Sequence, residues 1–276
     1  MKAPSHTVAG IDVGGTNKGF HAVALREERI VATLATSLPG EVVAWCRELH
    51  VSAVGVDAPC RWSHTGRSRL CERELAGLRM SCFATPSRLV GEVHPFYQWM
   101  VNGAELFRRL APHYRLYDGR TPLLEPLCFE TFPQAIACCL AGKMLSAKHK
   151  RIERRRLLEQ ATQRTDALTS IDEIDAALCA LAAQYVLAGS FNVFGDAAEG
   201  FILVPNRRLC RNPRQPIPLG HHLPELDKIL RFNYKSHGLS VALAFEEQFG
   251  APLMPSASRN PTPQKPGRNV RRFYGI

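Results

Sequence analysis

Residues 8–15 read VAGIDVGG, an apolar strand-like run that carries one acid, Asp12, and ends in two glycines. Two further strand-like runs follow at residues 19–26 and 30–37, and together the three predict an antiparallel meander. A helical pattern then precedes a β-branched run at residues 51–56. A strand that follows a crossover helix is expected to pair parallel with an earlier strand. The opening of the chain therefore predicts a mixed α/β sheet.

Residues 60–124 interrupt this alternation of strands and helices. We interpret them as an inserted helical subdomain, with helices near 68–78 and 97–110. After the insertion the core pattern continues with a strand at 127–132, a helix from 133, a basic stretch at 148–156, a helix at 170–188 and a strand at 200–204. This order predicts a layered α/β fold whose strands are mixed rather than purely parallel.

The last part of the chain differs in charge and composition. Residues 205–276 contain 12 Lys and Arg against 4 Asp and Glu, which gives +8 of the total formal charge of +10. They are also rich in proline and poor in periodic pattern. We therefore expect a folded domain at 1–204, followed by a basic, Pro-rich, partly disordered extension at 205–276.

Composition and cysteine spacing argue against several protein classes. The sequence has no signal-peptide pattern and no apolar stretch near the roughly 20 residues of a membrane helix, so no membrane partner is expected. The nine cysteines are odd in number and include no C-x-x-C pair. Cys60, Cys71 and Cys82 beside His64 could bind zinc, but their spacing matches no compact zinc knuckle, so buried or free thiols are favoured. Reduced thiols favour a cytoplasmic location.

Three carboxylates stand where charge is unusual. Asp12, Asp57 and Glu130 lie inside or at the ends of apolar strand-like runs, whereas charged residues are rarely buried unless they are paired or bind a metal. Each has a structural alternative: Asp12 could organise a hairpin turn, Asp57 could cap a strand, and Glu130 could pair with a basic residue of the insertion. Several carboxylates at the ends of neighbouring strands would repel one another without cations. Oxygen-only ligand sets suit Mg²⁺ or Mn²⁺.

Two more acids, Asp172 and Asp175, share one face of the helix expected at 170–188 because they are three residues apart. Asp172 has a strong structural alternative, since residues 170–173 read SIDE and fit a capping box at the start of a helix. Asp175 lies beyond the first turn and precedes AALCALAA, whose alanines would let the helix approach the sheet closely. Asp175 is therefore the better candidate ligand.

The order of these motifs resembles one family over about residues 7–204. The chain is similar to the family named domain of unknown function 429, a branch of predicted nucleases in the RNase H-like superfamily. The resemblance is carried by GIDVG at 10–14, GVDAP at 55–59, GRSRLCEREL at 66–75, ETFP at 130–133, AKHKRIERRRLL at 147–158, DEIDAALCALAA at 172–183 and EGFILVP at 199–205. The acidic helix is also similar to the last acidic helix of RuvC-type junction resolvases.

This resemblance implies an RNase H-like fold, with a mixed five-stranded sheet flanked by helices, and a metal-dependent nuclease that hydrolyses phosphodiester bonds in DNA or RNA. Two Mg²⁺ or Mn²⁺ ions would activate a water molecule and stabilise the leaving oxyanion. By the resemblance, Asp12, Asp57, Glu130 and Asp175 would be the catalytic, metal-binding acids, with Asp172 as an accessory ligand. If Asp175 is such a ligand, Asp175→Asn should also stabilise the metal-free protein by relieving like-charge repulsion.

A basic run lies between the expected helices that start at 133 and 170. Beside a cluster of metal-binding acids, such a run could hold the phosphates of a nucleic acid, and it is equally typical of a solvated helix face. The candidate nucleic-acid-binding residues are Lys148, Lys150, Arg151, Arg154 and Arg155.

Two other functions stay open. GIDVGGTN at 10–17 is also similar to the first phosphate loop of sugar kinases in the actin/hexokinase superfamily. Those kinases have a second glycine-rich phosphate loop, for which residues 117–121 are the candidate here, and they do not need an acidic pair on the last helix. A non-catalytic nucleic-acid-binding or scaffold protein on the same fold is the other alternative. Divalent-metal binding would distinguish a nuclease from a scaffold.

Overall fold

The computed structural model describes residues 6–120 and 126–206, so the extension expected from residue 205 lies almost wholly outside the described residues. The strands are β1 Thr7–Val13, β2 Phe20–Arg26, β3 Arg29–Thr36, β4 Val51–Asp57, β5 Arg115–Leu116, β6 Leu127–Glu130, β7 Phe191–Asp196 and β8 Gly200–Pro205. The α-helices are α1 Pro39–Glu48, α2 Leu70–Gly77, α3 Arg88–Val93, α4 Gln98–Leu110, α5 Pro133–Ala141, α6 Lys150–Ala161 and α7 Ile171–Leu187. Three single-turn 3₁₀ helices occupy Pro95–Tyr97, Ala147–His149 and Thr165–Ala167.

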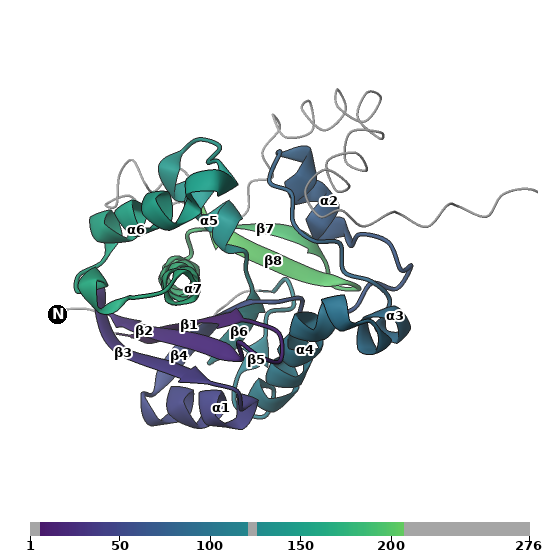
Figure 1. The fold of residues 1–276 in the computed structure, drawn as a ribbon, viewed down its shortest axis with the longest axis horizontal. Helices are drawn as coiled ribbons and strands as arrows, with labels where there is room; N and C mark the ends of the chain where they lie inside the picture. The colour runs from purple at the N-terminus through teal and green to yellow at the C-terminus, as the bar shows by residue number, and fades with distance from the viewer. Residues whose placement is uncertain (1–5, 121–125, 207–276) are drawn as a thin grey trace, which may run out of the picture. The chain divides into compact units, whose positions relative to one another are not determined.

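The strands form one mixed sheet in the order β3-β2-β1-β4-β6-β8-β7, with β5 also paired to β6 (Figure 1). The strands β1, β2 and β3 are antiparallel neighbours, whereas β1, β4, β6 and β8 run parallel. The predicted meander and the parallel crossover to β4 are confirmed, and with them the layered α/β fold with a mixed sheet.

Among the described residues the sheet has eight strands, whereas the resemblance implied five and the sequence pattern marked six strand-like runs. The sequence analysis missed β7 because its FNVFGD pattern carries a glycine and polar residues, as suits a half-exposed strand at the sheet edge. The two-residue strand β5 is too short to produce a pattern. The predicted strand at 127–132 ends earlier, at Glu130, because the chain turns there into α5.

Helices cover both faces of the sheet. On one face α7 and α5 pack against the sheet and α6 packs on α7, and on the other face lie α1 and α4 (Figure 1). The side chains of β1 alternate between the two hydrophobic cores on either side of the sheet. Val8 contributes to the core under α7, whereas Ala9, Ile11 and Val13 contribute to the core under α1 and α4. Because side chains alternate along a strand, Gly10 and Asp12 face the α7 side with Val8.

Glycines let α7 lie directly on the sheet. A Cβ added to Gly10 would lie 2.0 Å from the main-chain nitrogen of Ala180, and one added to Gly55 would lie 2.6 Å from the carbonyl oxygen of Cys179. No real side chain tolerates such distances, so only glycine fits at either position. The close approach expected from the alanines of α7 is therefore confirmed, and it also depends on the glycines of β1 and β4.

The insertion at 60–124 contains the two expected helices, observed as α2 and α4, and also the short helix α3, which was not predicted. It is closely joined to the core: α2 packs against β7, α4 packs against α1, and β5 adds to the sheet. Residues from this insertion therefore lie beside the carboxyl ends of β1, β4 and β6.

Among the described residues, Cys60, Cys71 and Cys82, which were considered for zinc, are free thiols. Burial raises the pKa of Cys82 to about 12 and also raises the pKa values of Cys60 and Cys71, which keeps these side chains protonated. None of the helices within residues 6–120 and 126–206 has the length and apolar character needed to cross a membrane.

Candidate active site

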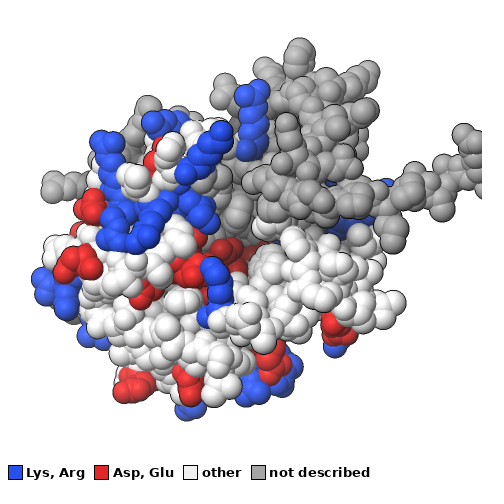
Figure 2. Space-filling view, in the orientation of Figure 1, with Lys and Arg blue, Asp and Glu red and all other residues white. Residues whose placement is uncertain are grey.

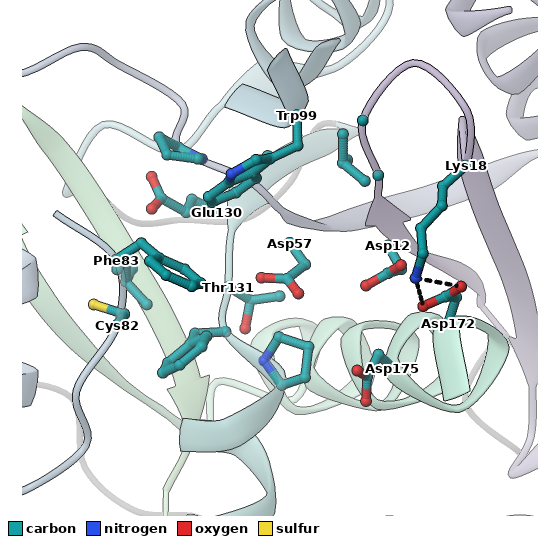
Figure 3. A pocket seen from close by; sticks show the side chains of 18 of the residues that line it. Asp12, Lys18, Asp57, Cys82, Phe83, Trp99, Glu130, Thr131, Asp172 and Asp175 are labelled. Carbon is teal, nitrogen blue, oxygen red and sulfur yellow. Dashed lines mark hydrogen bonds and ion pairs between the residues drawn. The ribbon is translucent and has the colours of Figure 1, made fainter. Parts of the chain in front are cut away.

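All five acids singled out by the sequence line one pocket of about 400 Å³ at the carboxyl ends of β1, β4 and β6 (Figure 3). They are Asp12, Asp57, Glu130, Asp172 and Asp175. Asp57 lies near the middle of the group, with Asp12, Asp172 and Asp175 to one side and Glu130 to the other. The sequence therefore predicted which carboxylates converge, although 163 residues separate Asp12 from Asp175.

The two strand aspartates are brought together by a repeated glycine–x–aspartate pattern. Gly10 pairs with Gly55 and Asp12 pairs with Asp57 across the parallel strands β1 and β4. In each strand the glycine admits α7, and the aspartate two residues later points to the same face just beyond it. The carboxylates of Asp12 and Asp57 are therefore neighbours on the α7 side of the sheet.

The helix α7 brings its acids to the same place. Asp175 lies one turn before Cys179, whose carbonyl contacts Gly55, so the helix places Asp175 above the ends of the two strands. The predicted capping box is present: the Ser170 hydroxyl accepts a hydrogen bond from the main-chain N–H of Glu173, and the Glu173 carboxylate reaches back to the N–H of Ser170. Asp172 takes no part in this cap and faces the pocket instead.

A lysine from the β1–β2 hairpin partly neutralises the acids. Lys18 Nζ lies 3.0 Å from both carboxylate oxygens of Asp172 (Figure 3). The hairpin is closed by hydrogen bonds from the N–H of Gly14 to the carbonyl of Gly19 and from the N–H groups of Lys18 and Gly19 to the carbonyl of Gly15. Three main-chain donors of this loop are thus used within it, which makes it a poor cradle for phosphate and weighs against the kinase alternative.

Asp175 has a buried charge partner on α6. Arg154 donates to its Oδ1 at 2.5 Å and to Gln134 Oε1 at 2.8 Å, and both charged side chains are more than nine-tenths buried. Replacing Asp175 alone would leave a buried guanidinium without its counter-charge. This pairing argues against the expectation that Asp175→Asn stabilises the metal-free protein, and we now expect that substitution to destabilise it.

Glu130 is held by the insertion, which is the structural alternative left open by the sequence. Arg69, only 1% exposed, donates to Glu130 Oε1 at 2.5 Å and to Oε2 at 2.8 Å. The main-chain N–H of Cys60 also donates to Oε2, and the guanidinium reaches Glu72 Oε1 at 2.8 Å. Both carboxylate oxygens of Glu130 are therefore engaged with the protein, and this geometry favours a structural role over the expected metal-binding one.

The electrostatics of the pocket reflect crowded carboxylates. Burial, followed by the charges of Asp175 and Asp172, raises the pKa of Asp12 from its ordinary value of 3.8 to about 8. Burial and the charge of Asp12 raise the pKa of Asp57 well above its ordinary value. Burial also raises the pKa of Asp175, although Arg154 opposes that shift. The folded protein without a bound cation therefore favours protonated aspartates at this position.

This shift predicts a pH dependence of stability. Between pH 3.8 and about 8 the folded state holds a proton on Asp12 that the unfolded state releases, so the free energy of unfolding falls as the pH rises through that window. We expect thermal unfolding in EDTA to show a loss on the order of 1–3 kcal/mol between pH 5 and pH 8.5. Asp12→Asn should flatten the profile. A stability that rises across this window in the wild type, with no effect of the substitution, would contradict the assignment.

As the side chains stand, no group of three or more His, Cys, Asp and Glu residues in the described ranges is placed to surround a metal ion. The ion pairs give a reason, because Lys18 and Arg154 hold Asp172 and Asp175 in place. The chemistry of the cluster nevertheless fits a hard divalent cation: its donors are carboxylate oxygens, and they repel one another in its absence.

The basic run divides into exposed and structural residues. Lys148, Lys150 and Arg151 are exposed on and just before α6. Arg154 is buried against Asp175, and Arg155 donates to the main-chain carbonyls of Thr165 and Leu168. Arg154 and Arg155 therefore bond within the protein in this structure, whereas the sequence predicted that they bind a nucleic acid. Arg151, although exposed, also donates to the main-chain carbonyl of Thr169 at 2.7 Å.

The sequence analysis missed the partners of the predicted acids. Lys18 and Arg69 were not singled out, although both line the pocket. Nothing in the sequence marked them, because a lysine in a turn and an arginine in a charged helical segment are usually exposed on the surface. The pocket also receives Phe83 and Trp99 from the insertion, and no periodic pattern marked them.

One family model matches most of the chain. The model of a family described as "Protein of unknown function (DUF429)" matches residues 10–200. The chain belongs to this family. No curated protein matches the sequence.

Two solved structures resemble this DUF429 chain. One is Thermus thermophilus RuvC, with 19% identity and a TM-score of 0.36, in an alignment that covers 66% of this chain and 96% of RuvC. The other is T. thermophilus RuvC in complex with Holliday junction substrate, with 16% identity, a TM-score of 0.37, and coverage of 67% of this chain and 96% of RuvC.

Proposed function

We propose that the acidic pocket binds Mg²⁺ or Mn²⁺ and hydrolyses phosphodiester bonds in nucleic acid. One observation carries the proposal: Asp12, Asp57 and Asp175 line a single pocket, where the charge of Asp175 helps to raise the pKa values of Asp12 and Asp57. A protein rarely keeps such mutually repelling groups buried without a function that needs them. A bound divalent cation would remove that repulsion.

Asp12 and Asp57 would hold the cation, because they are neighbours and their pKa values are the most strongly raised of the group. Asp175 and Asp172 would complete the ligand set once their pairing with Arg154 and Lys18 loosens. Bound divalent cations would supply activation of a water nucleophile and neutralisation of charge at the phosphoryl group. Glu130 is left out of this set because Arg69 and Cys60 already occupy its oxygens.

The surface around the pocket suits a polyanion. Figure 2 shows Lys and Arg side chains gathered over α6, next to the acidic side chains at the pocket. The exposed residues Lys148, Lys150 and Arg151 belong to this region, and Lys150 also lines the pocket. A phosphate backbone could therefore contact α6 while one phosphodiester lies at the aspartates, with an affinity that falls as salt rises.

Lys18 is expected to compete with the metal. Its ammonium must leave Asp172 before both oxygens of that carboxylate can hold a cation. Lys18→Met should therefore raise the affinity for Mn²⁺ about threefold, the effect of removing one exposed ion pair. Mn²⁺ titration followed by electron paramagnetic resonance measures this. Lys143→Met is the matched control, since Lys143 is exposed and lies outside the pocket lining. Equal or weaker binding by Lys18→Met would contradict the competition.

The activity is tested by incubating the full chain with labelled single-stranded, duplex and branched DNA and RNA in Mg²⁺ or Mn²⁺. Cleavage of any of them that is abolished by EDTA and by Asp57→Asn supports the proposal. Binding without cleavage, together with saturable metal binding lost in Asp57→Asn, would leave a metal site without nuclease activity. Binding of nucleic acid with no metal binding would favour the scaffold alternative.

A further inference from the structure

The wall of the pocket opposite Asp12 and Asp172 is aromatic. Phe83, in the segment before α3, and Trp99, on α4, both line the pocket, and their rings lie across it from these acids, with Asp57 between (Figure 3). The two ring centroids are 6.2 Å apart at an interplanar angle of 62°, which is an edge-to-face arrangement. Both residues belong to the insertion, so the insertion supplies a surface that the sheet and α7 do not.

The protein buries Phe83 only in part. Its side chain remains 39% exposed, whereas Trp99 packs partly against the core under α1 and α4. Phe96 also contacts Phe83, with the ring centroids 5.6 Å apart at 73°, but it does not line the pocket. Both ring contacts of Phe83 are edge-to-face, and they leave part of its ring exposed at the pocket.

The volume of the pocket limits the size of the ligand that could lie against these rings. About 400 Å³ lies at the lower end of the range for small-ligand sites, and it suits one nucleotide unit rather than a paired duplex. A base inside a duplex is covered on both faces by its neighbours and cannot stack on a protein ring. A base stacks on a ring only after it has left the helix, or when it belongs to a single strand.

We propose that one unpaired base stacks on the ring of Phe83, with Trp99 beside that ring, next to the phosphodiester held at Asp12 and Asp57. The substrate is then a nucleic acid with a single-stranded or extruded nucleotide at the cleavage position. This inference rests on the proposed function, because it assumes that a phosphodiester occupies the acidic side of the pocket. Aromatic stacking accepts every base, so the preference is for strand structure and not for sequence.

The test compares the affinity of the full chain for a labelled single strand and for the blunt duplex of the same sequence. Fluorescence anisotropy is measured at one fixed salt concentration with Ca²⁺, an oxygen-ligand cation, and gels confirm that the oligonucleotides stay intact. We expect the single strand to bind at least tenfold more tightly than the duplex. Phe83→Ala should weaken single-strand binding by about 5- to 30-fold, the range for losing one stacked base, and should leave duplex binding unchanged.

Two further variants separate stacking from a general disturbance of the insertion. Phe96→Ala removes a ring of similar exposure outside the pocket and should change single-strand affinity less than about twofold. Phe83→Trp keeps an aromatic face and should restore most of the lost affinity. Equal losses in Phe83→Ala and Phe96→Ala, or equal losses on single strand and duplex, would overturn the inference.

The inference and the proposed function can fail separately. If the protein cleaves blunt duplexes as fast as single strands, and Phe83→Ala has no effect on either, the nuclease stands and the stacking role is lost. If the single-strand preference depends on Phe83 but no cation-dependent cleavage occurs, the stacking surface stands and the catalytic proposal is lost. If no nucleic acid binds under these conditions, both are lost.

Discussion

Glu130→Gln is expected to lower the free energy of unfolding by about 3 kcal/mol, because it removes one of the two carboxylates that neutralise the buried guanidinium of Arg69 and leaves only Glu72. Arg69 is 1% exposed and joins Glu130 at the end of β6 to Glu72 on α2. The substitution would therefore loosen the insertion from the sheet. Urea unfolding followed by circular dichroism, in EDTA, measures the change.

Glu105→Gln is the matched control for this prediction. Glu105 also contacts two arginines, Arg108 and Arg109, which lower its pKa to about 2, but it lies on the surface of α4. Because water screens exposed ion pairs, its substitution should change the free energy of unfolding by less than about 1 kcal/mol. Similar changes in the two variants would show that the Arg69–Glu130 pair does not join the insertion to the sheet.

Asp57→Asn is expected to reduce the cleavage rate by about 10²–10³-fold, equivalent to several kcal/mol of transition-state stabilisation from the cation it holds. The same substitution should stabilise the metal-free protein at pH 8 by about 1–2 kcal/mol, since it removes a carboxylate that burial and Asp12 disfavour. A substitution that lowers activity and raises stability is typical of a functional group whose surroundings destabilise the folded protein.

Asp175→Asn provides the contrast. It removes a carboxylate that is paired with buried Arg154, so we expect both activity and metal-free stability to fall. Thermal unfolding in EDTA, with and without saturating Mn²⁺, distinguishes the two variants. If Asp57→Asn lowers stability as much as Asp175→Asn does, then Asp57 is a structural residue and not part of a repelling cluster.

The sequence was sufficient for much of the site because its key features are local. Gly10 and Asp12 in one strand, and Gly55 and Asp57 in another, produce the same two-residue pattern of a small residue followed by an acid on one face. The alanines after Asp175 marked the helix that packs on those glycines. Parallel neighbours align their carboxyl ends, so the parallel pairing expected after the crossover helix is consistent with Asp12 and Asp57 lying together.

The remaining features depend on contacts between distant segments. Glu130 looks like the other strand acids in the sequence, and only the position of Arg69, 61 residues earlier, makes it a structural partner. Arg154 likewise belongs to a basic run, and the fold turns it inward to Asp175 while its neighbour Arg151 stays exposed. A one-dimensional pattern records the charge of a residue but not the partner that the fold places opposite it.

Titration of the full chain with Mn²⁺, in the wild type and in Asp57→Asn, tests the central claim most directly. The account predicts saturable Mn²⁺ binding by the wild type, detected by electron paramagnetic resonance, and its loss in Asp57→Asn while that variant stays folded by circular dichroism. A wild-type protein that is folded and binds no Mn²⁺, or a variant that binds it as tightly as the wild type, would contradict the assignment of this pocket as a metal-dependent active site.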